Sequence, residues 1–171
     1  EDYTFDNVRI CAQGTADYLR ERGGSSRGLV VGYDTRLASE DYAVAVAEVS
    51  TANGIVTFLS NKATPTPTVA YSVVTHGAAG GAIITASHNP PQWNGFKFKP
   101  EYGGSASPEV VERLEWHIRE VEASRRVERL PLADAQAKGL LEYIDPEPVY
   151  LGHIGSLVDL AGIRKAGLTV V

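Results

Sequence analysis

Apolar runs of strand length alternate with helical segments through the first half of the chain. The predicted elements, in chain order, are a helix at 4–22, a strand at 29–34, a helix at 39–53, a strand at 55–59, a helix at 66–76 and a strand at 80–86. Parallel neighbours in a sheet need crossover connections, and right-handed crossovers cover both of its faces with helices. The alternation therefore predicts an α/β fold, a three-layer α/β/α sandwich around a mostly parallel (mixed) sheet of four strands.

Residues at the predicted helix ends support these boundaries. Thr4 and Ser39 are candidate N-caps, and Thr66-Pro67 combines an N-cap with a proline at the first helical position. A fourth helix is predicted to open at 107–109 (SPE) and to end before the charged stretch 125–129.

The pattern changes after residue 130, which predicts a second domain. Residues 1–130 are predicted to form the first domain, and residues 131–171 a linker followed by the truncated start of the second. The stretch 145–148 (DPEP) is typical of a linker, a helix is predicted at 149–162, and the apolar end 167–171 resembles the first half of a strand.

Charge and composition exclude several classes of partner. The net charge of -5 gives no general attraction to nucleic acid or to an anionic membrane, so phosphate recognition has to be local. The single cysteine, Cys11, excludes an intramolecular disulfide framework, and no apolar run has the length of a membrane span. We expect no nucleic-acid or membrane partner and a cytoplasmic location.

Polar residues follow two of the predicted strands. The first strand ends in Asp34-Thr35-Arg36, and the third in the segment TASHNPPQWNGFKFK at 85–99, which places Ser87, His88 and Asn89 side by side. Ligands of parallel sheets gather beyond the carboxyl ends of the strands. These two loops are therefore predicted to share one rim and to form a site.

The second loop resembles a specific family. The stretches VGYDTR, TASHNPPQWNGFK and KPEYGGSASPE are similar to the phosphoserine loop region of the α-D-phosphohexomutases, the phosphoglucomutase and phosphomannomutase family. The resemblance covers the family's first domain and the entry to its second. It implies a parent protein that interconverts the 1- and 6-phosphates of glucose or mannose through a phosphoserine and a hexose 1,6-bisphosphate. Its partners would be these sugars and the remaining domains of the parent chain.

The resemblance also implies roles for individual residues. Ser87 would carry the phosphoryl group, Lys97 would act as general acid and base, and His88 would belong to the catalytic segment. Asn89, Arg36 and Lys99 are candidates for binding phosphate or substrate. The roles of three of these residues stay open at this point: Arg36 can instead form a salt bridge with Asp34 or Glu40, Asn89 can simply cap a turn before Pro90, and nothing fixes the role of Lys99.

The family uses Mg²⁺ held by closely spaced aspartates and by the phosphate on the serine. The aspartates of this chain are scattered singly, with no D-x-D-x-D run. Because Mg²⁺ prefers clustered oxygen ligands, Ser87 is predicted to contribute to the metal through its phosphate, with the aspartate ligands beyond Val171.

Three other interpretations compete with this one. A serine hydrolase is disfavoured because the G-x-S-x-G elbow is missing around Ser87. A non-catalytic sugar-phosphate-binding module and a phosphoglucosamine mutase both stay open. The isolated 171-residue chain is expected to be inactive by itself.

Overall fold

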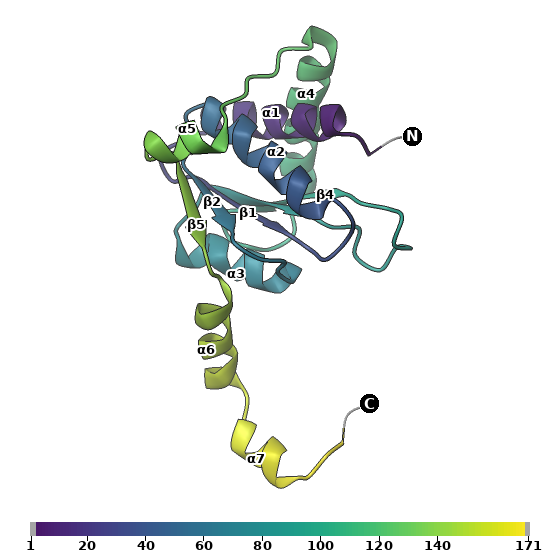
Figure 1. The fold of residues 1–171 in the computed structure, drawn as a ribbon, viewed down its shortest axis with the longest axis vertical. Helices are drawn as coiled ribbons and strands as arrows, with labels where there is room; N and C mark the ends of the chain where they lie inside the picture. The colour runs from purple at the N-terminus through teal and green to yellow at the C-terminus, as the bar shows by residue number, and fades with distance from the viewer. Residues whose placement is uncertain (1–2, 170–171) are drawn as a thin grey trace.

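The computed structural model describes residues 3–169. Twelve elements follow one another along this part of the chain (Figure 1): α1 (Phe5–Glu21), β1 (Leu29–Tyr33), α2 (Ser39–Ala52), β2 (Thr57–Ser60), α3 (Thr66–Thr75), β3 (Gly80–Ile84), β4 (Phe96–Pro100), α4 (Pro108–Ser124), α5 (Leu132–Ala137), β5 (Leu141–Ile144), α6 (Glu147–Leu157) and α7 (Leu160–Lys165).

The sheet is mixed and has the strand order β4-β3-β1-β2-β5. β1 lies parallel to β2 and β3, β2 lies parallel to β5, and β4 runs antiparallel to β3. The predicted α/β class and mostly parallel sheet are confirmed, whereas the predicted count of four strands is wrong because there are five. The alternation of Phe and Lys in β4 is the pattern of a half-buried strand, and its terminal proline suits a position at the edge of a sheet.

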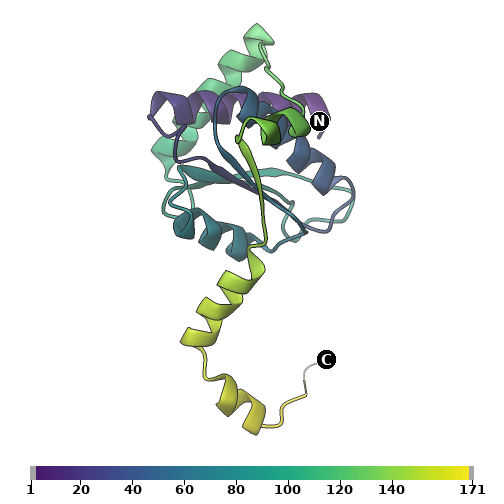
Figure 2. The ribbon, with the colours of Figure 1, turned by 60° about the vertical axis from the view of Figure 1, so that its left-hand side comes forward.

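Helices cover both faces of the sheet, as Figures 1 and 2 show. One face packs against α1 and α2, with α4 lying against α1, in a core that includes Leu19, Val31 and Val46. The other face packs against α3 through a second cluster that includes Val69 and Val73. β1 and β3 are buried at every position, so they form the centre of the domain.

Side chains cap the first and fourth helices as predicted, but not the second and third. Thr4 Oγ1 accepts a hydrogen bond from the backbone amide of Asn7 at 3.2 Å. Helix α2 is instead capped by Ala38, a left-handed residue with φ 59°, and Ser39 is the first helical residue. Helix α3 likewise begins at Thr66, with Pro65 as its N-cap. The Ser39 hydroxyl instead donates to Asp34 Oδ1 and accepts from Asn94 Nδ2.

The sheet continues past the predicted domain boundary at residue 130. Strand β5 pairs with β2, with Leu141 opposite Thr57 and Ile144 opposite Ser60. Ala135 of α5 is fully buried in the same core. Residues up to 144 are therefore part of the layered α/β/α unit, while the assignment of the later residues to a second domain stays a prediction.

The last two helices extend away from the body of the domain (Figure 2). Neither α6 nor α7 buries a residue, and the contact of α6 with α3 includes a stacked pair, Tyr71 and His153, with ring centroids 4.5 Å apart. The predicted helix at 149–162 is thus two helices, separated at Val158-Asp159. Leu168 and Thr169 are not in a strand, and the rest of the predicted terminal strand lies outside the described residues. No helix within residues 3–169 combines the length and apolar character needed to cross a bilayer.

Candidate active site

The two polar loops lie together at the carboxyl ends of β1 and β3, as predicted. The backbone amide of Asp34 donates to the carbonyl of Ile84 at 3.0 Å, which keeps the neighbouring strands paired to their last residues. Beyond them lies an open hollow of about 830 Å³. Its lining includes the predicted residues Arg36, Ser87, His88 and Asn89, together with Asp34, Thr35, Leu37, Pro65, Thr66, Pro67, Thr85 and Pro91.

Ser87 lies in the loop after β3 and lines this hollow. It is exposed, and its backbone is left-handed with φ 58°, a conformation that costs a non-glycine residue about 1 kcal/mol or more. Its amide donates to Thr85 Oγ1 at 3.0 Å, and its Oγ lies 3.4 Å from His88 Nδ1. The hydroxyl is therefore free for chemistry and has a potential proton partner beside it.

The N-terminus of α3 borders the hollow on the side of Thr66. At this end Pro67 has no N–H, and the amides of Thr68 and Val69 donate to the Pro65 carbonyl, so its contribution is the partial positive charge of the helix dipole rather than a set of free donors. This end of the hollow therefore favours a negatively charged group such as a phosphate.

Arg36 reaches across from the loop after β1 to the loop that carries Ser87. Its Nη groups donate to four backbone carbonyls of that loop: Nη1 to Pro90 at 2.8 Å and Trp93 at 2.9 Å, Nη2 to Ser87 at 2.9 Å and Asn89 at 2.7 Å. Its Nε donates to Asp34 Oδ2 at 3.2 Å. The ion pair with Asp34 that sequence reasoning weighed is thus present, but it sits within the site rather than on an open surface, because the Arg36 side chain is 13% exposed.

Asp34 anchors the guanidinium and is itself held from several sides. Its Oδ1 accepts from the backbone amide of Arg36 at 3.0 Å and from Ser39 Oγ at 3.0 Å. Burial raises the pKa of this carboxyl, but the hydrogen bond from Thr85 and those from Arg36 and Ser39 outweigh burial, so the pKa lies below its usual value. Asp34 therefore stays ionised beside Arg36.

Lys97 and Lys99 lie on β4 and are not among the residues that line the hollow. Lys97 is opposite Ile83 in the antiparallel pair. Phe96 and Phe98 pack against the α1 and α2 core, so the two lysines project from the other face of the strand, the face that α3 covers. Both lysines are thus on the same side of the sheet as the helix end that borders the hollow.

Sequence reasoning missed the residues that orient this site. Asn94 Nδ2 donates to Ser39 Oγ at 2.9 Å, and Thr85 contacts both Asp34 and the Ser87 amide. Single Ser, Thr and Asn residues in loops are common in ordinary turns, so no sequence signal distinguished these. Among residues 3–169 no group of three or more His, Cys, Asp or Glu side chains could hold a metal ion.

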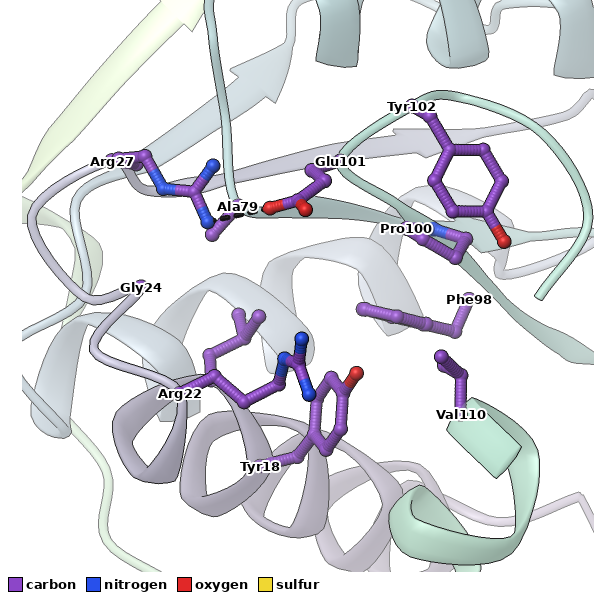
Figure 3. A pocket seen from close by; sticks show the side chains of 11 residues that line it. Tyr18, Arg22, Gly24, Arg27, Ala79, Phe98, Pro100, Glu101, Tyr102 and Val110 are labelled. Carbon is purple, nitrogen blue, oxygen red and sulfur yellow. Dashed lines mark hydrogen bonds and ion pairs between the residues drawn. The ribbon is translucent and has the colours of Figure 1, made fainter. Parts of the chain in front are cut away.

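A second, smaller pocket lies at the amino ends of the parallel strands, and Figure 3 shows the side chains that line it. It measures about 70 Å³ and is lined by residues that include Tyr18, Arg22, Arg27 and Glu101. Arg27 pairs with Glu101 at 2.6 Å, and the Arg22 guanidinium lies 5.8 Å from the centre of the Tyr18 ring. Its small volume, its internal ion pair and its place at the amino ends of the parallel strands make it a weaker candidate.

The fold and site define a class: a three-layer α/β/α domain that exposes a serine-bearing loop at the carboxyl edge of its sheet. Residues 1–125 match the family described as phosphoglucomutase/phosphomannomutase, alpha/beta/alpha domain I. The chain belongs to this family, as its resemblance in sequence implied.

Individual relatives agree with this assignment. A phosphoglucomutase of Komagataeibacter xylinus is 29% identical over 98% of this chain and 32% of its own length. A phosphoglucosamine mutase of Caldicellulosiruptor bescii is 29% identical over 84% of this chain and 30% of its own length. A solved structure from Thermus thermophilus, described as a phosphomannomutase, is 31% identical with a TM-score of 0.77, over 93% of this chain and 33% of that one. The chain thus spans about a third of the length of these relatives.

Proposed function

We infer that this chain is the phosphoserine-carrying part of a phosphohexomutase that interconverts a hexose 1-phosphate and a hexose 6-phosphate. The observation that carries the proposal is Ser87, whose exposed hydroxyl projects at the open hollow of about 830 Å³ on the carboxyl edge of the sheet. The neighbouring end of α3 favours an anion there, which suits a serine phosphate and a sugar phosphate.

The proposed reaction transfers two phosphoryl groups in sequence. Phosphorylated Ser87 gives its phosphoryl group to a free hydroxyl of the bound sugar phosphate, forming a hexose 1,6-bisphosphate, and then recovers the other phosphoryl group after the sugar reorients. We propose that Lys97, the lysine of the family-like motif, acts as general acid and base: it takes the proton of the attacking hydroxyl and returns a proton to the oxygen that leaves. It projects on the side of the sheet that faces α3. His88 and Asn89 are proposed to donate hydrogen bonds to phosphate oxygens, and Lys99 to contribute positive charge.

Mg²⁺ is proposed as the cofactor. When bound, it would neutralise negative charge on the transferring phosphoryl group. The serine phosphate is the one ligand that these residues offer, and Asp34 is already engaged by Arg36 and Ser39. The aspartate ligands are therefore proposed to come from the part of a longer parent chain that its relatives possess, and the 171-residue chain alone is proposed to be inactive.

The substrate is proposed to be a phosphate of glucose or mannose. A glucosamine phosphate is the alternative, because one relative is named phosphoglucosamine mutase. A non-catalytic module that binds sugar phosphates is a second alternative, which would keep the hollow without the chemistry.

Phosphoryl exchange at Ser87 tests the proposal. The full-length parent is purified without phosphatase, and its intact mass and the peptides around Ser87 are measured before and after incubation with glucose, mannose or glucosamine 1-phosphate and Mg²⁺. We expect one phosphoryl group on Ser87, exchanged with at least one of these sugars and absent from Ser87→Ala. A serine that stays unmodified even with hexose 1,6-bisphosphate and Mg²⁺ would leave the binding module as the better description.

A further inference from the structure

Every N–H group of the Arg36 guanidinium is already engaged. A guanidinium has five N–H donors, and here four point to backbone carbonyls of the Ser87 loop and one to Asp34. The carbonyls belong to residues 51 to 57 positions away in the chain. A phosphate oxygen could bind Arg36 only by displacing one of these bonds.

Asp34 fixes the guanidinium from behind. The carboxylate accepts from the Nε of Arg36 and from its backbone amide, so it fixes both the guanidinium and the backbone of this residue. It also balances the positive charge of Arg36, which leaves little net charge for attracting a dianion. Thr85 links the same carboxylate to the Ser87 amide, since it bonds to Asp34 and accepts from Ser87.

The loop needs such external support. Ser87 has a left-handed backbone with φ 58°, and strained conformations persist only where the surrounding structure fixes them. The backbone bonds within the loop are short-range, such as Asn89 to Ala86 at 3.0 Å and Trp93 to Pro90 at 3.1 Å. Arg36 ties these separate turns to the segment after β1 by four hydrogen bonds, and Asn94 adds one to Ser39 Oγ from the end of the loop.

We propose that Arg36, anchored by Asp34, is a positioning residue that clamps the backbone of the Ser87 loop, and not a ligand of phosphate. The proposal rests on the function proposed above for Ser87, because positioning matters there through the phosphoryl carrier. Arg36 and Asp34 would then act in the transfer step by positioning Ser87. The four carbonyl bonds hold the Ser87 hydroxyl in one place beside the hollow before any substrate binds.

A lysine at position 36 separates the two roles. Lysine keeps the positive charge, but its three donors on one nitrogen cannot span four carbonyls and a carboxylate. A phosphate ligand would be partly preserved in Arg36→Lys, whereas a clamp would be lost.

The test compares the full-length parent with its Arg36→Lys variant in two measurements. The first is hydrogen exchange of residues 86–94 in the dephosphorylated, ligand-free protein. We expect exchange at least about tenfold faster in R36K, because several hydrogen bonds worth about 1 kcal/mol each are lost. The second is steady-state mutase kinetics, in which we expect kcat to fall about 100-fold with KM for the sugar phosphate nearly unchanged.

Arg27→Lys is the matched control. Arg27 also forms an ion pair, with Glu101 at 2.6 Å, but at the opposite end of the sheet. It is expected to leave both the loop exchange and kcat at wild-type values.

Two results would overturn the clamp: loop exchange in R36K within twofold of the wild type, or a defect confined to a raised KM. If R36K does not fold, Asp34→Asn provides the same test, because it removes the anchor and keeps the four carbonyl bonds. Loop exchange at least about threefold faster in D34N supports the clamp, and unchanged exchange rejects it. Failure of the proposed function is a different result, since wild-type Ser87 would then take up no phosphoryl group while the exchange measurement still reports on the clamp.

Discussion

Ser87 combines the candidate nucleophile with backbone strain in one residue. Its φ of 58° places it in the left-handed region, where a Cβ is unfavourable and glycine is not. Ala38, which precedes α2 on the neighbouring loop, has a similar φ of 59°. The left-handed backbone therefore occurs both at Ser87, which has a hydroxyl, and at Ala38, which has none.

Replacing Ser87 by glycine or alanine separates the strain from the chemistry. We expect Ser87→Gly to be about 1 kcal/mol more stable than Ser87→Ala, because alanine keeps the unfavourable Cβ. Both variants should lose all phosphoryl exchange at this position. Urea unfolding followed by circular dichroism gives the stabilities, and mass spectrometry gives the phosphorylation.

Ala38→Gly is the control for this comparison. It should gain about 1 kcal/mol for the same backbone reason and keep Ser87 competent for phosphorylation. Equal stability of S87G and S87A would show that the left-handed conformation carries no strain in this loop.

At the scale of elements, the close packing of α1 on α4 depends on Gly14, which has no side chain. A Cβ at Gly14 would lie 2.6 Å from Ile118 Cγ1 and 2.8 Å from both Ile118 Cα and its amide nitrogen. Two of these three contacts are with backbone, so a rotamer change cannot relieve them. At Gly152 of α6, by contrast, a Cβ would meet nothing within 4 Å.

We therefore expect glycine-to-alanine changes of opposite effect in these two helices. Gly14→Ala should lower the free energy of unfolding by about 2 kcal/mol, because it separates α1 from α4. Gly152→Ala should leave stability unchanged or raise it slightly, since alanine is the better helix former. Urea denaturation measures both, and a Gly14→Ala variant as stable as the wild type would mean that α4 is free to shift.

At the scale of the whole molecule, β5 decides where the first domain ends. Leu141 and Ile144 are 5% and 7% exposed, and they close the sheet beside β2. The following helices α6 and α7 bury no residue. We thus expect a stable unit that includes β5 and excludes the two last helices.

Two truncations test this expectation. A chain ending at Pro148 should unfold cooperatively with a free energy within about 1 kcal/mol of the 171-residue chain. A chain ending at Leu130 should lose about 4 kcal/mol, because it lacks α5 and β5 with the buried side chains of Ala135, Leu141 and Ile144, and because the edge of β2 is exposed. Equal stability of the two truncated forms would instead support the boundary at residue 130 that the sequence predicted.

The sequence alone predicted the layers of this protein and the loop that carries its candidate chemistry. Alternating strand and helix patterns are local, because they depend on side-chain periodicity and capping within one segment, so the α/β class and the central strands β1, β2 and β3 could be recognised. The loop at 85–99 was recognisable because its Ser, His, Asn and Lys residues are contiguous and resemble one family's motif.

The tertiary structure decided what those residues contact. Arg36 was predicted at the rim, but its four carbonyl partners lie 51 to 57 residues away, and no local pattern encodes such a pairing. The sequence predicted four strands and gave bounds only to β1, β2 and β3, and the fifth strand went unpredicted. The edge strands β4 and β5 each pair with a single neighbouring strand, so their place in the sheet depends on that pairing rather than on a local pattern. Local preferences therefore determined the elements, and long-range hydrogen bonds and packing determined the sheet edges and the clamp on Ser87.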